Sequence, residues 1–183
     1  MANKKNIVRR IKSAVISVSD KSNLKPLLQT LNRYNVKLIS SGGTFKAIRK
    51  LGYRCLEVSD YTGFNEILDG RVKTLHPKIH AGILNKRNNN SHKREIKKNN
   101  FQNIDLVIVN FYPFEKTLNT TKNHNKIIEK IDIGGPALVR SAAKNYNDVA
   151  VITSINQYSA LIDQLKRFKG ATKLEFRKKL SQS

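Results

Sequence analysis

The sequence is poor in cysteine and in long apolar runs. Its single cysteine, Cys55, has no second cysteine with which to form an internal disulfide, and such a chain suits a reducing cytoplasm. No apolar run approaches the roughly 20 residues that span a bilayer, and residues 7–12 carry too much charge for the apolar part of a signal peptide. These absences predict a cytoplasmic protein that does not enter a membrane.

Acidic side chains are also scarce. The chain has 13 Asp and Glu against 35 Lys and Arg, which gives a net charge of +22. A basic surface attracts phosphate backbones. These cations, however, are spread along the whole chain, stand among many asparagines in residues 85–103, and do not alternate with aromatic residues. We therefore expect nonspecific attraction to nucleic acid at low salt, and no specific nucleic-acid partner.

The histidines do not form a metal-binding motif. They have no cysteine partners, and His76 and His80, which are four residues apart, have Pro77 between them. A helical His-x-x-x-His pair would also need acidic support, which this stretch lacks. We predict no metal site.

The chain does contain an alternation of apolar runs and amphipathic patterns. Strands are expected at 14–18, 36–39, 104–109 and 148–152, with a weaker one at 53–58. Helices are expected at 24–31, after residue 44 through 51, at 158–165 and from 172 to 180, with a short one within 60–68 and a polar surface helix or loop in 85–103. This order predicts a single α/β domain, a three-layer and mostly parallel sheet with helices on both faces.

Two turns at the ends of the first two expected strands have the composition of an anion site. Ser17, Ser19, Asp20 and Lys21 end the first strand, and residues 41–44 (SGGT) end the second. Because ligands of open α/β sheets bind beyond the carboxyl ends of the strands, the hydroxyls and free N–H groups of these turns suit a phosphate. The alternative is a pair of ordinary turns with Ser and Thr caps.

Residues 69–82 are unusually dense in cations and imidazoles. Arg71, Lys73, His76, Lys78 and His80 fall within ten positions. The apolar residues follow neither a helix nor a strand period, and Pro77 argues against a regular helix through the middle. The stretch is therefore interpreted as an irregular segment, either one that binds a ligand or a solvated cationic loop.

A second dense segment, residues 131–145, is expected to begin a helix at Pro136 and to end it at Asn145. Gly134 and Gly135 leave the first N–H groups of this helix uncovered, and such a helix start can hold developing negative charge. Asp132, just before them, is either a catalytic group or only a cap. Arg140 and Lys144 share a helix face, which on an ordinary helix is solvated.

Several segments together resemble one enzyme family. They are residues 17–21 (SVSDK), 41–44 (SGGT), 60–64 (DYTGF), 69–77 (DGRVKTLHP), 110–114 (NFYPF), 131–136 (IDIGGP) and 140–145 (RSAAKN). In order and spacing they look like the N-terminal domain of the bifunctional AICAR transformylase/IMP cyclohydrolase family, over about residues 12–180.

The resemblance implies a methylglyoxal-synthase-like domain that closes the ring of 5-formamidoimidazole-4-carboxamide ribonucleotide to IMP with loss of water, the last step of de novo purine biosynthesis. It implies a homodimer, no metal and no organic cofactor. Lys144 matches the catalytic lysine of the family, with Lys73, Tyr112 and Asp132 as helpers. The positions that match the family's substrate contacts are Ser17, Ser19, Asp20, Lys21, Ser41, Gly42, Gly43, Thr44, Arg71, Val72, Thr74, Val109, Asn110 and Ile133.

This chemistry suits the residue types. In the expected mechanism Lys144, paired with Asp132, relays the proton of the attacking carboxamide nitrogen, while Lys73 and Tyr112 donate hydrogen bonds to the formyl oxygen. Holding both reacting groups of one molecule together supplies much of the rate.

The chain departs from the family pattern in two places. Family members continue into a larger transformylase domain, whereas this sequence stops at Ser183, so transformylase activity is expected to be absent. Ser22-Asn23 stands where the family has Thr-Gly. Two alternatives to the enzyme remain open: a module that binds a phosphorylated effector without chemistry, and a folded but inactive remnant with a basic surface.

Overall fold

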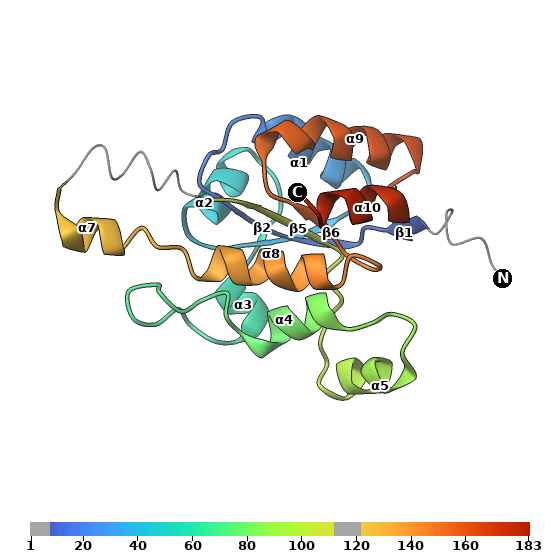
Figure 1. Ribbon diagram of the computed structural model, residues 1–183, viewed down its shortest axis with the longest axis horizontal. Coiled ribbons are helices and arrows are strands. Elements are labelled where there is room, and N and C mark those ends of the chain that lie inside the picture. Colours follow the sequence, from blue (N-terminus) through green and yellow to red (C-terminus); the bar gives the residue numbers. More distant parts are fainter. Residues whose placement is uncertain (1–7, 112–121) are drawn as a thin grey trace.

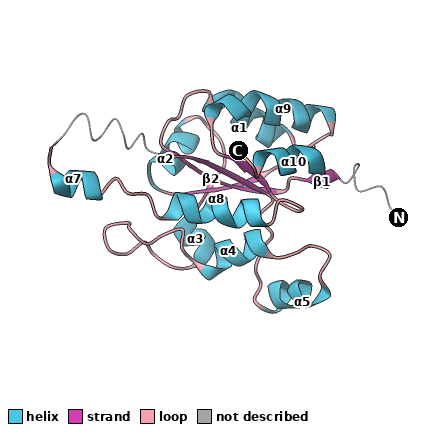
Figure 2. Ribbon diagram, in the orientation of Figure 1, coloured by secondary structure: helices cyan, strands magenta, loops and turns pink. Residues whose placement is uncertain are grey.

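The computed structural model describes residues 8–111 and 122–183, and its centre is a parallel sheet. Within these residues five strands pair in the order β4-β3-β2-β5-β6, and every pair is parallel. Figure 2 shows strands of the sheet in magenta between the helices. The strands are β2 (Ser13–Val18), β3 (Lys37–Ser40), β4 (Leu56–Glu57), β5 (Leu106–Asn110) and β6 (Ala150–Ile152). β2 and β5 are buried on both faces, as expected for apolar central strands of a parallel sheet.

Helices cover both faces of this sheet (Figure 1). α1 (Leu24–Arg33), α9 (Tyr158–Arg167) and α10 (Leu174–Leu180) lie on one side, and α3 (Val58–Thr62), α4 (Pro77–Leu84) and α8 (Gly134–Lys144) lie on the other. The apolar stripe of α1 (Leu24, Leu27, Leu28 and Leu31) is fully buried. The predicted α/β fold with helices on both faces is thus confirmed.

The remaining helices lie nearer the edges. α2 (Gly42–Lys50) follows β3 directly, α5 (Asn90–Lys98) contains no buried residue, and α7 (His124–Ile128) stands well apart from the sheet (Figure 1). A short 3₁₀ turn, Ile155–Gln157, precedes α9. α5 therefore confirms the helical reading of the polar 85–103 segment.

Two predicted elements differ from the structure. The strand expected at 53–58 is reduced to β4, because its register pairs it only with Ile39 and Ser40 at the end of β3, and Val58 already begins α3. The stretch 69–82 is irregular only in its first half. Pro77 is the first residue of α4, where its missing N–H is harmless, and the His76 imidazole accepts a hydrogen bond from Lys78 N at 3.1 Å.

One part of the fold had no sequence signal. β1 (Val8–Arg10) pairs antiparallel with β7 (Ala171–Lys173), so the last helix, α10, begins at Leu174 rather than at 172. Arg177 of α10 is fully buried and donates to the carbonyl oxygens of Tyr146 (3.0 Å), Asn147 (2.9 Å) and Thr172 (2.5 Å). These bonds attach the C-terminal helix to the loop before β6 and to β7. Among the described residues, the helices are all too short or too polar to cross a membrane.

Candidate functional site

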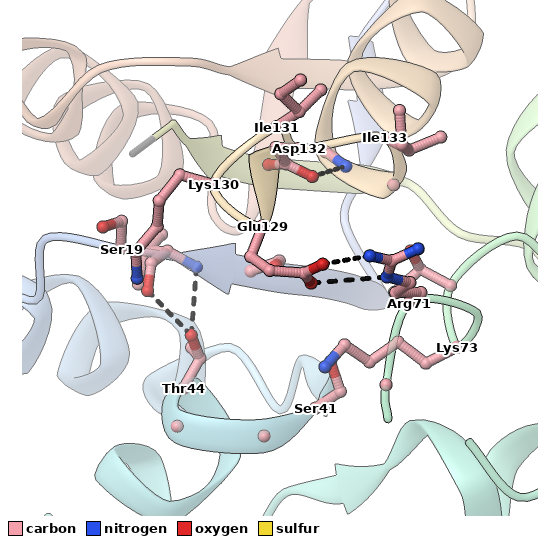
Figure 3. Close-up of a pocket in the computed structure, with 18 of the residues that line it drawn as sticks. Ser19, Ser41, Thr44, Arg71, Lys73, Glu129, Lys130, Ile131, Asp132 and Ile133 are labelled. Atoms are coloured by element: carbon pink, nitrogen blue, oxygen red, sulfur yellow. Dashed lines mark hydrogen bonds and ion pairs between the residues drawn. The ribbon is translucent and has the colours of Figure 1, made fainter. Parts of the chain in front are cut away.

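A cavity of about 500 Å³ opens at the carboxyl ends of β2, β3 and β5 (Figure 3). Its walls come from the turn after β2, the start of α2, residues 69–74, residues 128–133 and the start of α8. This is the edge at which parallel α/β sheets bind ligands, and the volume lies within the range of about 300–1,000 Å³ typical of small-molecule sites. Both dense sequence segments therefore meet at one place.

On the β2 side, the cavity wall is held by two side chains that form hydrogen bonds with backbone atoms. Asn110 Oδ1 accepts hydrogen bonds from Ser19 N (2.6 Å) and Asp20 N (2.9 Å), and its amide nitrogen donates to Asp20 O at 2.8 Å. Thr44 Oγ1 accepts from Val18 N at 3.1 Å and donates to Val18 O at 2.9 Å. Asn110 and Thr44 thus fix the shape of the turn. Contacts with a ligand would then come from the neighbouring residues of the cavity.

Two ammonium groups approach the start of α2. Lys73 Nζ lies 3.8 Å from the position that a Cβ on Gly42 would take, and Lys21 Nζ lies 4.0 Å from that of Gly43. Gly42 has a φ of 53°, a conformation that favours glycine. A helix start offers free N–H groups and the positive end of the helix dipole. Two lysines from separate segments therefore reinforce an anion site there.

The opposite wall is the start of α8, where Asp132 and two glycines pack tightly. Asp132 Oδ1 accepts a hydrogen bond from Gly135 N at 2.8 Å. A Cβ on Gly135 would lie 2.9 Å from Asp132 Cγ, and one on Gly134 would overlap Thr74 Oγ1. Asp132 is therefore a cap of α8, and its second carboxylate oxygen is left for another role.

Arg71 and Glu129 form an ion pair inside the cavity (Figure 3). The hydrogen bond from the Arg71 guanidinium lowers the pKa of the Glu129 carboxyl and raises the pKa of Arg71. Lys73 Nζ lies 3.6 Å from Glu66 Oε2. Sequence reasoning missed Glu129, together with Ile128, Lys130 and Asp69, which also line the cavity. The only available signal for Glu129 was its place three residues before Asp132.

Behind this wall, α4 is joined to α8 by His80. Its Nδ1 lies 3.0 Å from Ser141 Oγ, while its Nε2 is buried without a hydrogen-bond partner. Burial lowers the pKa of His80, although the nearby Thr74 backbone opposes this effect. A neutral imidazole thus supports the helix pair next to the cavity.

Most of the predicted site residues line this cavity. They are Ser17, Ser19, Lys21, Ser41, Gly42, Gly43, Thr44, Arg71, Lys73, Thr74, Asn110, Asp132 and Ile133. Three predicted contacts do not line it. Val72 makes backbone hydrogen bonds with Ile67, Val109 is buried beneath Gly135, and Asp20 Oδ1 accepts from Ser22 N. Tyr112 lies outside the described residues.

Lys144 is placed differently from the expectation. It is the last residue of α8, it is exposed, and it is not among the residues that line the cavity. Ten helical steps separate it from Gly134, which is about 15 Å at 1.5 Å per residue. Within one chain Lys144 and Asp132 therefore do not pair, because α8 holds them at opposite ends.

Comparison with known proteins agrees with this geometry. Residues 23–137 match the family model of the MGS-like domain. The chain belongs to the MGS-like domain family. Residues 142–183 of this MGS-like domain match a second model, the AICARFT/IMPCHase bienzyme. The expected family and fold are confirmed.

Named relatives of this MGS-like domain are purine-biosynthesis proteins. It is 47% identical over 173 residues to the bifunctional purine biosynthesis protein PurH of Bradyrhizobium diazoefficiens, and 49% identical over 170 residues to PurH of Clostridioides difficile. These matches cover 94% and 93% of this chain but only 33% of each relative, so the chain spans about a third of their length. The crystal structure of ForH is similar with a TM-score of 0.82 and 31% identity, over 94% of this chain and 90% of that one.

Proposed function

We propose that this domain is an IMP cyclohydrolase, which closes the ring of 5-formamidoimidazole-4-carboxamide ribonucleotide to IMP and releases water. The relatives named PurH support a role in purine biosynthesis. The observation that carries the finer proposal is one cavity with Lys21 and Lys73 at the start of α2 on one side and Asp132 on the other. Lys21 and the start of α2 suit a nucleotide phosphate, Lys73 suits a hydrogen bond to the reacting oxygen, and Asp132 suits a proton transfer.

Each step of the reaction has a group to serve it. Lys21 and the N–H groups at the start of α2 bind the 5′-phosphate. The carboxamide nitrogen attacks the formyl carbon, forming the new C–N bond, and its proton passes through the free oxygen of Asp132 to the former formyl oxygen, which becomes a hydroxyl. The formamido nitrogen then loses its N–H proton to this hydroxyl, the C–O bond breaks, the ring C=N bond forms and water leaves. Lys73 donates a hydrogen bond to the formyl oxygen and stabilises the negative charge that develops on it during the attack. Fixing both reacting groups of one molecule is worth about 7–11 kcal/mol of the barrier.

The direct test is to mix the purified chain with the formamido substrate and to follow IMP formation by absorbance. Lys73→Met should abolish turnover while IMP still binds, because Lys21 and the helix start remain. Asp132→Asn should also abolish turnover, since an amide retains the hydrogen bond to Gly135 N but accepts no proton. Normal turnover in both variants, or a wild-type chain that neither binds nor forms IMP, would refute the assignment.

A homodimer is part of this proposal, and Lys144 enters it only as a residue of a second copy. What supports it is exposure at both ends of α8: Ile133, just before the helix at the cavity end, is 59% exposed, and Lys144, its last residue, is also exposed. Two copies of α8 that pack antiparallel about a two-fold axis bring the end of one helix beside the start of the other. Mixing Lys73→Met and Lys144→Ala subunits should then restore activity that neither variant has alone.

The second candidate is a module that binds a phosphorylated effector without turning it over. The lysines at the start of α2 favour it, because they suffice for a phosphate without any contribution from Asp132. Tight IMP binding with no IMP formation would select this candidate over the enzyme. In either case we propose a cytoplasmic location, which suits the unpaired Cys55.

A further inference from the structure

Glu129 occupies the proposed substrate cavity with a negative charge. Its carboxylate points across the cavity to Arg71, and the two side chains remain 55% and 62% exposed (Figure 3). Burial therefore does not force this pairing. The contact joins the segment between α7 and α8 to residues 69–74, two parts of the wall that a ligand must lie between.

The other charges of the cavity show why this pair differs. The charged residues that line it are Lys21, Asp69, Arg71, Lys73, Glu129, Lys130 and Asp132. Asp132 is engaged by Gly135 N, Lys21 stays close to the start of α2, and Lys73 lies near both that helix start and Glu66, which is not among the residues that line the cavity. Arg71 is thus a cation of the cavity wall whose partner is a carboxylate of the same wall.

Arg71 lines the same cavity as Lys21 and the start of α2, where the proposed phosphate site lies, and it comes from the same segment as Lys73, whose Nζ reaches Gly42. Guanidinium binds carboxylate and phosphate with the same two-pronged geometry, and Arg71 can therefore exchange one for the other. A phosphate and the Glu129 carboxylate would repel each other if both remained.

We propose that Glu129 is an internal competitor for the phosphate site: it pairs with Arg71 when the site is empty and is displaced when the phosphate of a nucleotide arrives. It thereby lowers affinity for free phosphate and reserves the site for ligands that add nucleoside contacts. The choice of IMP as probe rests on the proposed function, whereas the competition itself requires only a phosphate.

Calorimetric titration of the purified chain with inorganic phosphate and with IMP at low salt tests this. Glu129→Gln should tighten both ligands by about threefold to tenfold, because Arg71 is released from a charged partner. Inosine, which has no phosphate, should bind no more tightly than before. Glu175→Gln on α10 is the matched control, since it makes the same charge change at an exposed site outside the cavity and should change neither affinity.

A double-mutant cycle shows whether Glu129 acts through Arg71. In an Arg71→Gln background, Glu129→Gln should give no gain in phosphate affinity. Unchanged or weaker phosphate binding in Glu129→Gln, or a gain that persists without Arg71, overturns the proposal. If IMP fails to bind every variant while the phosphate shift remains, the competition holds and the cyclohydrolase assignment fails. If IMP forms normally but Glu129→Gln changes the affinity for neither ligand, the cyclohydrolase assignment holds and the competition fails.

Discussion

Gly135 offers the sharpest test of the architecture at the start of α8. The backbone at Gly135 does not have a positive φ, so alanine can adopt it without strain, and any effect of Gly135→Ala comes from the added methyl group. That methyl carbon would lie 2.9 Å from Asp132 Cγ and 3.1 Å from Val109 Cγ1. Separations below 3.0 Å are essentially never tolerated, and the Asp132 side chain, which is the more mobile of the two neighbours, must leave its place.

The two energetic consequences for stability nearly cancel. Losing the hydrogen bond from Gly135 N to Asp132 Oδ1 costs about 1 kcal/mol, as for other helix caps. Alanine in place of glycine in a helix returns up to about 1 kcal/mol. The free energy of unfolding of Gly135→Ala should therefore stay within about 1 kcal/mol of wild type, while a displaced Asp132 should lower the rate of IMP formation about a hundredfold.

Urea unfolding and the absorbance assay for IMP check both halves of this prediction. Asp132→Ala/Gly135→Ala completes the test, because removing the carboxylate also removes the clash. The double variant should be more stable than the sum of the single changes implies, by about 1 kcal/mol. Additive stabilities, or wild-type turnover in Gly135→Ala, would show that the methyl group does not displace Asp132.

Two further predictions concern stability. Arg177→Ala should cost about 3–5 kcal/mol in urea unfolding, because three carbonyl oxygens lose their donor and the fully buried Arg177 side chain is removed. The exposed Lys178→Ala on the same helix should cost less than about 0.5 kcal/mol, and equal losses would refute this role. His80 has a lower pKa in the fold than in the unfolded chain, so the stability from its neutral form is present above about pH 6.5 and lost as pH falls through the folded pKa. His80→Asn should flatten this acid loss, and an unchanged pH profile would contradict it.

Several features of the site were readable from local sequence because they depend on short-range rules. The glycines and hydroxyls of residues 41–44 predict a turn that leads into a helix, and Pro136 after Gly134 and Gly135 predicts a second helix start. Strand ends of a parallel sheet share one edge, so the two turns had to converge. The reading of residues 69–82 was only half right, because the same proline rule allows both an interruption and a helix start.

Other assignments required distances that no local pattern contains. Asn110 matched a substrate contact, yet its amide is used by the backbone of the β2 turn. Lys144 shares a segment with Asp132 in the sequence but is held about 15 Å from the start of α8 by the rise of the helix. Glu129 became visible as a site residue only through its contact with Arg71, which is 58 residues away in the chain.

The sequence by itself determined the layered α/β fold, the buried central strands and the edge of the sheet at which the cavity opens, because hydrophobic period and turn chemistry act over a few neighbouring residues. The tertiary structure alone decided which charges share the cavity: Lys21 and Lys73 beside α2, Arg71 paired with Glu129, and Lys144 outside it. The physical reason is that strand register and helix length set the separations between distant segments, and electrostatic partnership depends on those separations rather than on order along the chain.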